Sequence, residues 1–302
     1  MDSCCVCGCE AANKDANNEE LRWCSRQSDH KAYMCVTCVA RYVTTIISSD
    51  FAGVCSPMIC PLCPKEEGKG GKRKTKTLDY IVWKLLVSED KVKFHNTLAS
   101  SLLLFLCGGC HAQRSLMVDT SQTQRPHAME FLKAKLIELA SSSTLSSSKT
   151  EEAESEPFFA AIALFEEGIM SVDEYYTLLS EQFLPKLFLT SASDDQQVFE
   201  TFKHILRLVA DPERRANLHL RHLRSRPRVW TSCCSREHCF KCRTKDSHQG
   251  RTCQSVTLQL DSSIVDCPSC GILLTRGDGC NRFVQSSYIE DLTHLLTNST
   301  TN

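Results

Sequence analysis

The sequence predicts several small α+β modules, each closed by bound metal ions, with a helical insertion between them. The first observation is the number of cysteines, 20 among 302 residues. The second is their distribution, because ten lie within 4–63, two within 107–110 and eight within 233–280. The third is that residues 111–232 contain no cysteine and carry apolar side chains at helical spacing. We therefore expect two or three zinc-stapled α+β modules with a helical insertion.

Composition and charge narrow the classes of partner and compartment. The 35 basic and 36 acidic side chains nearly cancel, so we expect no nucleic acid and no membrane as a partner. The N-terminus lacks the basic and apolar stretches of a signal peptide, and the longest apolar run, 98–107, is too short to span a bilayer. We expect a cytoplasmic or nuclear protein. In such a reducing compartment, clustered cysteines are interpreted as metal ligands in preference to disulfides.

The region after the first cysteine cluster combines polar segments with helices. Residues 65–106 read as a linker followed by a helix. The basic run 65–77 is compatible with a nuclear signal, although a solvated loop is the interpretation that we favour. A further helix is predicted at 128–140. Residues 141–156 are rich in serine and glutamate without an apolar period, so we expect disorder there.

Residues 157–210 look like three helices that form a small apolar core. Pro157 stands at a plausible first-turn position of the first helix. Ser171 and Glu174 have the spacing of a capping box at the start of the second. The apolar stripes of these helices favour a packed core over a cofactor site.

The first cysteine cluster contains four pairs of potential metal ligands. A Cys-x2-Cys pair supplies two ligands from one tight turn, and structural zinc takes four thiolate or imidazole ligands in a closed tetrahedron. Eight ligands therefore predict two zinc ions. In chain order the pairs are Cys4/Cys7, Cys24/His30, Cys35/Cys38 and Cys60/Cys63. Cys5, Cys9 and Cys55 are left over, as alternative ligands or as small buried residues.

The order and spacing of these pairs resemble a RING domain, here residues 1–64. The resemblance implies that the first and third pairs share one zinc and that the second and fourth pairs share the other. It also implies contact with a ubiquitin-conjugating enzyme through Val6 in the first pair and through Pro61 and Leu62 in the last. Pro64 follows where many simple RINGs carry an activating arginine, which is typical of the RING–IBR–RING class. The alternative is a PHD-like or zinc-ribbon-like module without a ligase role.

Residues 234–253 resemble the C-terminal half of an IBR domain. We place this IBR-like domain at 107–256, interrupted by the helical insertion at about 111–230. The resemblance implies one zinc with a complete set of three thiolates and one imidazole. Its ligands are Cys239, Cys242, His248 and Cys253.

A second IBR zinc requires ligands from both ends of the insertion. We expect it to join Cys107 and Cys110 to Cys234, with Cys233 or a histidine as the fourth ligand. The alternative is that this site is lost and that the Cys-Gly-Gly-Cys sequence is a glycine turn at a helix end. Within the hundred residues before Cys234, the histidines are His204, His219 and His222.

Residues 264–285 resemble the start of a second RING domain, also called Rcat. The resemblance implies that Cys267 and Cys270 are zinc ligands and that Cys280, in a Gly-Cys-Asn tripeptide, is the catalytic nucleophile. Its thiolate would accept ubiquitin as a thioester and lose it to a lysine amine. The alternative interpretation makes Cys280 another zinc ligand.

The resemblance ends after Phe283. Position 285 holds Gln285 where the family carries another cysteine, and Arg282 stands where relatives often place a histidine as general base. We therefore expect an incomplete Rcat domain, from a truncated or mis-spliced gene product, followed by an unstructured tail at 286–302. A protein that has lost transfer activity is the alternative.

Together these resemblances imply a ubiquitin-protein ligase of the RING–IBR–RING type. The expected cofactor is Zn²⁺, at about three to four ions per chain. The expected partners are a ubiquitin-conjugating enzyme, ubiquitin and a protein substrate with an acceptor lysine. Two other functions are compatible with the sequence: a plain RING ligase that only docks the conjugating enzyme, and a catalytically inactive zinc-binding adaptor.

Overall fold

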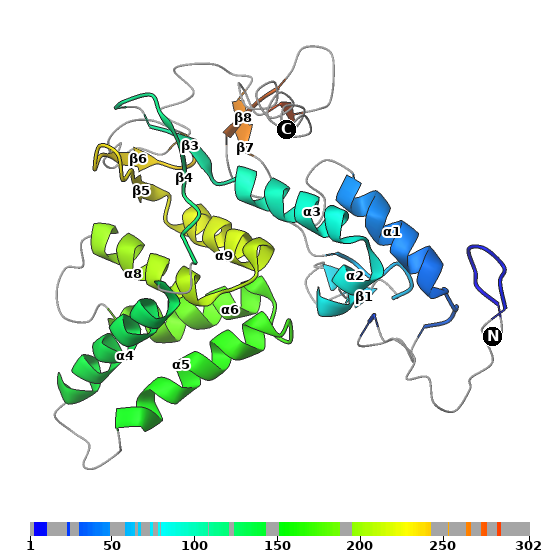
Figure 1. Cartoon of the computed structure of the whole chain (residues 1–302), viewed down its shortest axis with the longest axis horizontal. Coiled ribbons are helices and arrows are strands. Elements are labelled where there is room, and N and C mark those ends of the chain that lie inside the picture. Colours follow the sequence, from blue (N-terminus) through cyan, green and yellow to red (C-terminus); the bar gives the residue numbers. More distant parts are fainter. Residues whose placement is uncertain are drawn as a thin grey trace.

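The computed structural model contains a small N-terminal module and a larger helical assembly, with helix α3 (Glu89–Ser101) in contact with both (Figure 1). Among the described residues, no helix combines the length and apolarity needed to cross a membrane. The mixture of helices and small sheets agrees with the predicted α+β class. The structure describes residues 3–10, 23–24, 30–48, 58–63, 66–67, 73–74, 78, 80–107, 109–120, 124–142, 151–187, 195–242, 253, 264–266, 273–276 and 283–284.

The N-terminal module is built on helix α1 (Val36–Ser48). Val39, Val43 and Ile47 follow one another at four-residue spacing, so they share one face of α1, and all three are fully buried. Helix α2 (Tyr80–Leu86) packs against α1 and contributes a buried tryptophan to the same core. This core is small, so cross-links between distant segments add stability that apolar burial alone does not supply.

Short extended segments complete the N-terminal module. Cys4 forms an isolated parallel bridge with Tyr33, which places the start of the chain beside the segment that leads into α1. Strands β1 (Glu66–Glu67) and β2 (Arg73–Lys74) form a two-residue antiparallel hairpin within the basic linker. The region predicted as linker and helix therefore contains a hairpin and two helices.

Helices α2 and α3 are separate because the chain is extended between them. Ser88, with φ −64° and ψ 151°, precedes α3 as its N-cap residue. Glu89 and Asp90 then occupy the first turn of α3, where carboxylates interact favourably with the helix dipole. The prediction of a single helical region was correct in type but missed this break.

The helical insertion packs around a core of aromatic and aliphatic side chains, including Phe158, Phe165 and Phe202. The elements of the insertion are α4 (Gln124–Ser142), α5 (Glu151–Glu166), α6 (Val172–Leu178), the π-helix η2 (Leu179–Phe183), α7 (Leu184–Leu187), α8 (Asp195–Leu208) and α9 (Pro212–Ser225). Helix α4 packs on α5 and α8, whereas α6 packs on α9.

Two sequence predictions about these helix starts had different outcomes. The capping box is confirmed, because Ser171 Oγ accepts from the Glu174 backbone N–H and the Glu174 carboxylate accepts from the Ser171 backbone N–H. The expectation of disorder at 141–156 was wrong for 151–156, because α5 begins at Glu151 and Pro157 lies inside it, and for 141–142, which end α4; residues 143–150 lie outside the described residues. The four glutamates of 151–156 are good helix formers and favour a helix start.

Two antiparallel hairpins stand at the two ends of the helical insertion. The first pairs β3 (Leu104–Leu106) with β4 (Gln113–Ser115), and the second pairs β5 (Arg228–Trp230) with β6 (Glu237–Cys239). Side chains from both hairpins share one buried apolar core with α3 and α9, in which Phe240 is fully buried. This shared core holds the beginning and the end of the insertion together.

The last described elements form a three-stranded antiparallel sheet in the order β7-β8-β9. Its strands are β7 (Ile264–Asp266), β8 (Leu273–Arg276) and β9 (Phe283–Val284). The predicted tail at 286–302 lies outside the described residues.

Candidate metal centres

Four groups of cysteine and histidine side chains converge in the described part of the chain. Within each group, all ligand atoms lie within 4.8 Å of one another. We number them in chain order. Centre 1 contains Cys4, Cys7, Cys9 and Cys35, centre 2 contains Cys24, His30, Cys60 and Cys63, centre 3 contains Cys107, Cys110, Cys233 and Cys234, and centre 4 contains Cys239, Cys242 and Cys253.

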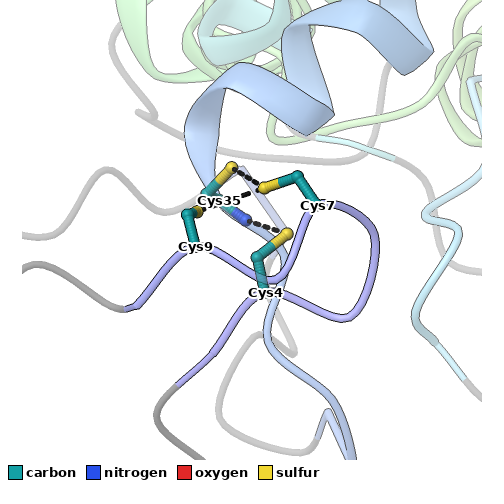
Figure 2. A group of neighbouring side chains, drawn as sticks. All are labelled: Cys4, Cys7, Cys9 and Cys35. Atoms are coloured by element: carbon teal, nitrogen blue, oxygen red, sulfur yellow. Dashed lines mark hydrogen bonds between the residues drawn. The ribbon is translucent and has the colours of Figure 1, made fainter.

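Centre 1 joins the N-terminal turn to the start of α1 (Figure 2). Cys7 Sγ lies 3.2 Å from Cys9 Sγ and 3.7 Å from Cys35 Sγ. The backbone N–H of Cys35 donates to Cys4 Sγ over 3.3 Å. Cys7 and Cys35, which are 28 positions apart in the sequence, are thereby brought close enough for one metal ion to cross-link them.

Cys38 also faces centre 1 from the first turn of α1. Its thiol is buried and interacts with the side chains of Cys7, Cys35 and Cys4. Burial, followed by these thiol contacts, raises the pKa of Cys38 to about 12. Five cysteines therefore surround this point, one more than a tetrahedral ion needs, and Cys9 is the one that the sequence prediction left unassigned.

The pKa values of the thiols at centre 1 are shifted in opposite directions. Hydrogen bonds from the backbone N–H groups of Cys35 and Cys7 lower the pKa of Cys4 to about 5. The contact with Cys7 instead raises the pKa of Cys9 to about 12. Neighbouring thiols thus compete for ionisation, and a bound divalent cation would relieve this competition because it stabilises every thiolate it touches.

Centre 2 combines three sulfurs with one imidazole. His30 Nε2 lies 3.4 Å from Cys63 Sγ and 3.5 Å from Cys60 Sγ, while Cys24 Sγ lies 3.4 Å from Cys63 Sγ. Burial is the first cause that raises the pKa of Cys63 to about 12. The six-residue spacing between Cys24 and His30 does not prevent the two side chains from meeting.

Centres 1 and 2 are interleaved along the chain. The first cysteine pair meets Cys35 from the third pair, whereas the second pair meets the fourth. The stretch of chain between the first and last ligands of each centre therefore contains ligands of the other centre. Val6, in the first turn, is 63% exposed. Pro61 is exposed and Leu62 is half-buried, packed against the core of the N-terminal module.

Centre 3 joins the two hairpins that flank the helical insertion. Cys110 Sγ lies 3.5 Å from Cys233 Sγ. A Cβ atom on Gly109 would lie 3.2 Å from Cys234 Sγ, so a glycine permits this close approach. Cys233 is the residue that the structure brings to the fourth position, whereas His204, His219 and His222 lie on α8 and α9 and are not part of the group.

Cys107 is the buried member of centre 3. Its Sγ lies 3.5 Å from Thr231 Oγ1 and 3.8 Å from His238 Nε2. Hydrogen bonding from the backbone of Cys110, followed by these two side chains, lowers the pKa of Cys107 to about 4. Sequence analysis missed Thr231 and His238, because neither stands at a recognisable ligand spacing.

Centre 4 has three described members. Cys239 Sγ lies 3.5 Å from Cys253 Sγ. The contact with Cys242, followed by burial, raises the pKa of Cys239. His248, predicted as the fourth ligand, lies outside the described residues, as do the predicted Rcat residues Cys267, Cys270 and Cys280.

Comparison with known proteins gives no relative: no family model, curated protein or solved structure matches this chain. The inference about function therefore rests on the side chains themselves. Soft thiolate donors, with one imidazole at centre 2, are a donor set that fits zinc. The four groups are positioned to bind metal ions.

Proposed function

We propose that this chain is a zinc-binding ubiquitin-protein ligase of the RING–IBR–RING type. The observation that carries the proposal is the interleaved pairing of centres 1 and 2, which accompanies the ligand order of a RING domain. Two closed four-ligand sets hold a small module rigidly, which is the role of structural zinc. When bound, zinc would supply cross-links between distant segments.

We assign docking of the ubiquitin-conjugating enzyme to the surface of the N-terminal module. Val6 is 63% exposed on the turn that carries the first two ligands, and Ile59 is 42% exposed directly before Cys60. Pro61 is exposed on the last ligand pair. Apolar side chains that metal coordination would hold at the surface are suited to a partner protein, because little entropy is lost when they bind. We propose that these side chains contact the ubiquitin-conjugating enzyme.

The transfer step is assigned to Cys280 from the sequence. Its thiolate would attack the carbonyl carbon of the thioester between ubiquitin and the conjugating enzyme. A new carbon–sulfur bond to Cys280 forms, and the thiolate of the conjugating enzyme leaves. A substrate lysine amine then attacks the new thioester, forms an isopeptide bond and releases the Cys280 thiolate, while the amine proton passes to solvent.

One assay tests this function in the full-length chain. The protein is incubated with a ubiquitin-loaded conjugating enzyme, and the products are separated on a non-reducing gel. We expect a ubiquitin adduct that reducing agent removes and that Cys280→Ser abolishes. Ubiquitin discharge without an adduct would contradict the thioester step and identify a plain RING ligase. Absence of ubiquitin discharge by a zinc-loaded protein would contradict both ligase mechanisms. The catalytically inactive zinc-binding adaptor would then be the remaining function.

A further inference from the structure

Three six-residue turns in this protein share one closing geometry. They are 4–9, 107–112 and 231–236, and each is closed by an antiparallel residue pair. The closing pairs are Ser3 with Glu10, Leu106 with Gln113, and Trp230 with Glu237.

The hydrogen bonds inside the three turns also coincide. In each, the first backbone N–H donates to the carbonyl of the sixth residue, over 2.7, 3.0 and 3.1 Å in chain order. The fifth N–H donates to the first carbonyl over 2.8 Å in all three. The fifth residue has a positive φ each time, 72° at Gly8, 55° at His111 and 50° at Ser235. His111 and Ser235 adopt this conformation without the freedom of glycine, at a cost of about 1 kcal/mol each.

The shared geometry defines which positions of a turn present ligands. In the first two turns, the cysteines occupy the first and fourth positions: Cys4 with Cys7, and Cys107 with Cys110. In the third turn, the fourth position is Cys234, but the first is Thr231. Thr231 is only 3% exposed, and its Oγ1 points to within 3.5 Å of Cys107 Sγ. A threonine therefore stands where the turn geometry expects a ligand.

The missing sulfur comes from the third position of the same turn. Cys233 is exposed, and its Sγ lies 3.5 Å from Cys110 Sγ and within 4.8 Å of the other sulfurs of centre 3. A second polar group, His238 Nε2, lies 3.8 Å from Cys107 Sγ and is buried. Centre 3 thus offers four sulfurs, of which one is out of register.

We propose that centre 3 holds zinc through Cys107, Cys110, Cys234 and the out-of-register ligand Cys233, while Thr231 acts as a positioning residue that hydrogen-bonds the Cys107 sulfur. The proposal rests on the zinc binding of the proposed function. Cys110 and Cys233 are both exposed, but only Cys233 lies outside the usual turn position.

Moving the ligand back into register tests the proposal. We compare the wild-type chain with Cys233→Ser and with the double variant Thr231→Cys/Cys233→Ser, each loaded with Co²⁺ or Zn²⁺. Cobalt reports the number of thiolates through its sulfur-to-metal absorption, and chelator competition reports affinity. Alkylation of released thiols, mapped by mass spectrometry, shows which centre has lost its ion. Circular dichroism verifies that each variant is folded.

The expected results separate a ligand from a hydrogen-bonding neighbour. Cys233→Ser should weaken metal binding at centre 3 by more than about 100-fold, beyond the roughly 10- to 100-fold typical of residues that only contact a ligand. The double variant should recover tetrathiolate absorption and most of the affinity. His238→Gln, the matched control, should lose at most about 100-fold and keep all four sulfur contributions.

Three outcomes would overturn the proposal. Full metal binding by Cys233→Ser would remove Cys233 as a ligand, and loss of the ion in His238→Gln would identify the histidine instead. Failure of the folded double variant to recover the metal would refute the register argument. Cys107→Ser separates these results from a failure of the proposed function. If this variant binds as many metal ions as the wild type, centre 3 holds no zinc at all.

Discussion

The Sγ atoms of Cys110 and Cys233 lie 3.5 Å apart, although 123 positions separate the two residues in the sequence. They meet because the β3–β4 and β5–β6 hairpins share one apolar core beneath centre 3. Apolar packing therefore brings the two ends of the helical insertion together, and a metal ion would lock them there. Since the cost of closing a loop rises only logarithmically with its length, a long folded insertion is compatible with this arrangement.

The first prediction concerns this cross-link. Cys110→Ser should lower the free energy of unfolding by about 2–4 kcal/mol in the presence of zinc, because the folded chain then binds the ion at centre 3 less tightly and loses the stabilisation that this binding supplies. Urea denaturation with zinc and with excess chelator measures the effect. Cys5→Ser, which removes an exposed thiol outside the four groups, is the control. An equal loss with and without zinc would attribute the effect to the side chain alone.

The second prediction concerns two buried histidines of α9. Burial lowers the pKa of His219 to about 3 and holds the pKa of His222 well below its usual value. Below pH 6.5, the unfolded chain therefore binds protons that the folded chain does not. The stability from these neutral imidazoles is present above pH 6.5 and is lost as the pH falls toward 3, at up to about 1.4 kcal/mol per pH unit for each histidine.

Urea unfolding between pH 7 and pH 4.5 tests this dependence. His219→Leu removes one buried imidazole and should flatten the slope of stability against pH relative to the wild type. His127 is exposed on α4, so His127→Leu should leave the slope unchanged. Equal slopes for the wild type and His219→Leu would show that this imidazole does not control the acid sensitivity.

The third prediction concerns Asp211, which has two roles at the start of α9. Its Oδ1 accepts from the Arg214 backbone N–H as an N-cap, and its Oδ2 accepts from Lys84 on α2. Asp211→Ala should therefore cost about 2 kcal/mol, of which the cap supplies about half. Asp211→Asn keeps the cap and should cost less. Asp173→Ala, which breaks the exposed pair with Arg221, should cost under about 1 kcal/mol.

The fourth prediction concerns docking of the conjugating enzyme. Val6→Ala should reduce the rate of ubiquitin discharge by about tenfold, equivalent to about 1.4 kcal/mol, while the zinc content stays unchanged. Leu85→Ala is a suitable control, because Leu85 is 71% exposed on α2, outside the metal-binding turns. Equal effects of the two substitutions would remove the specific role of Val6.

The fifth prediction ranks the five cysteines around centre 1. Cys38 is buried in the first turn of α1 and interacts with the side chains of Cys7, Cys35 and Cys4, whereas Cys9 is exposed. Cys38→Ser should therefore weaken metal binding more than Cys9→Ser. Chelator competition on both variants measures the order. The reverse order would make Cys9 the fourth ligand and Cys38 a buried structural thiol.

The ligand pairs could be recognised from the sequence because the spacing of two ligands in one turn is a local property. The meeting of the Cys24/His30 pair with the Cys60/Cys63 pair, and of Cys107 with Cys234, required long-range packing, and the structure supplies it. The ligand roles themselves stay predictions. Cys9 was the easiest residue to misjudge, because its Cys-Gly-Cys spacing from Cys7 is shorter than that of a usual pair.

Other features depended on information that spacing does not carry. Cys233 and Cys234 are adjacent, so only the hydrogen bonds of their turn reveal that Thr231 occupies the first position. The start of α5 was missed because low hydrophobicity outweighed helix propensity in the interpretation of residues 151–156. His219 and His222 were candidate ligands in the sequence, but they lie among the aromatic side chains of α8 and are part of the packed core.

The hairpins at centre 3 give the molecule the organisation of a host and a guest. The chain leaves the host after β4 and returns at β5, and the shared core under the two hairpins keeps these exit and entry points adjacent. The guest, 124–225, has a separate apolar core of its own. Helices α4 to α7 contribute to this core and not to the shared one, so they can change length or surface chemistry without moving the four sulfurs. Recognition of new partners can diversify in the guest while the host geometry is preserved.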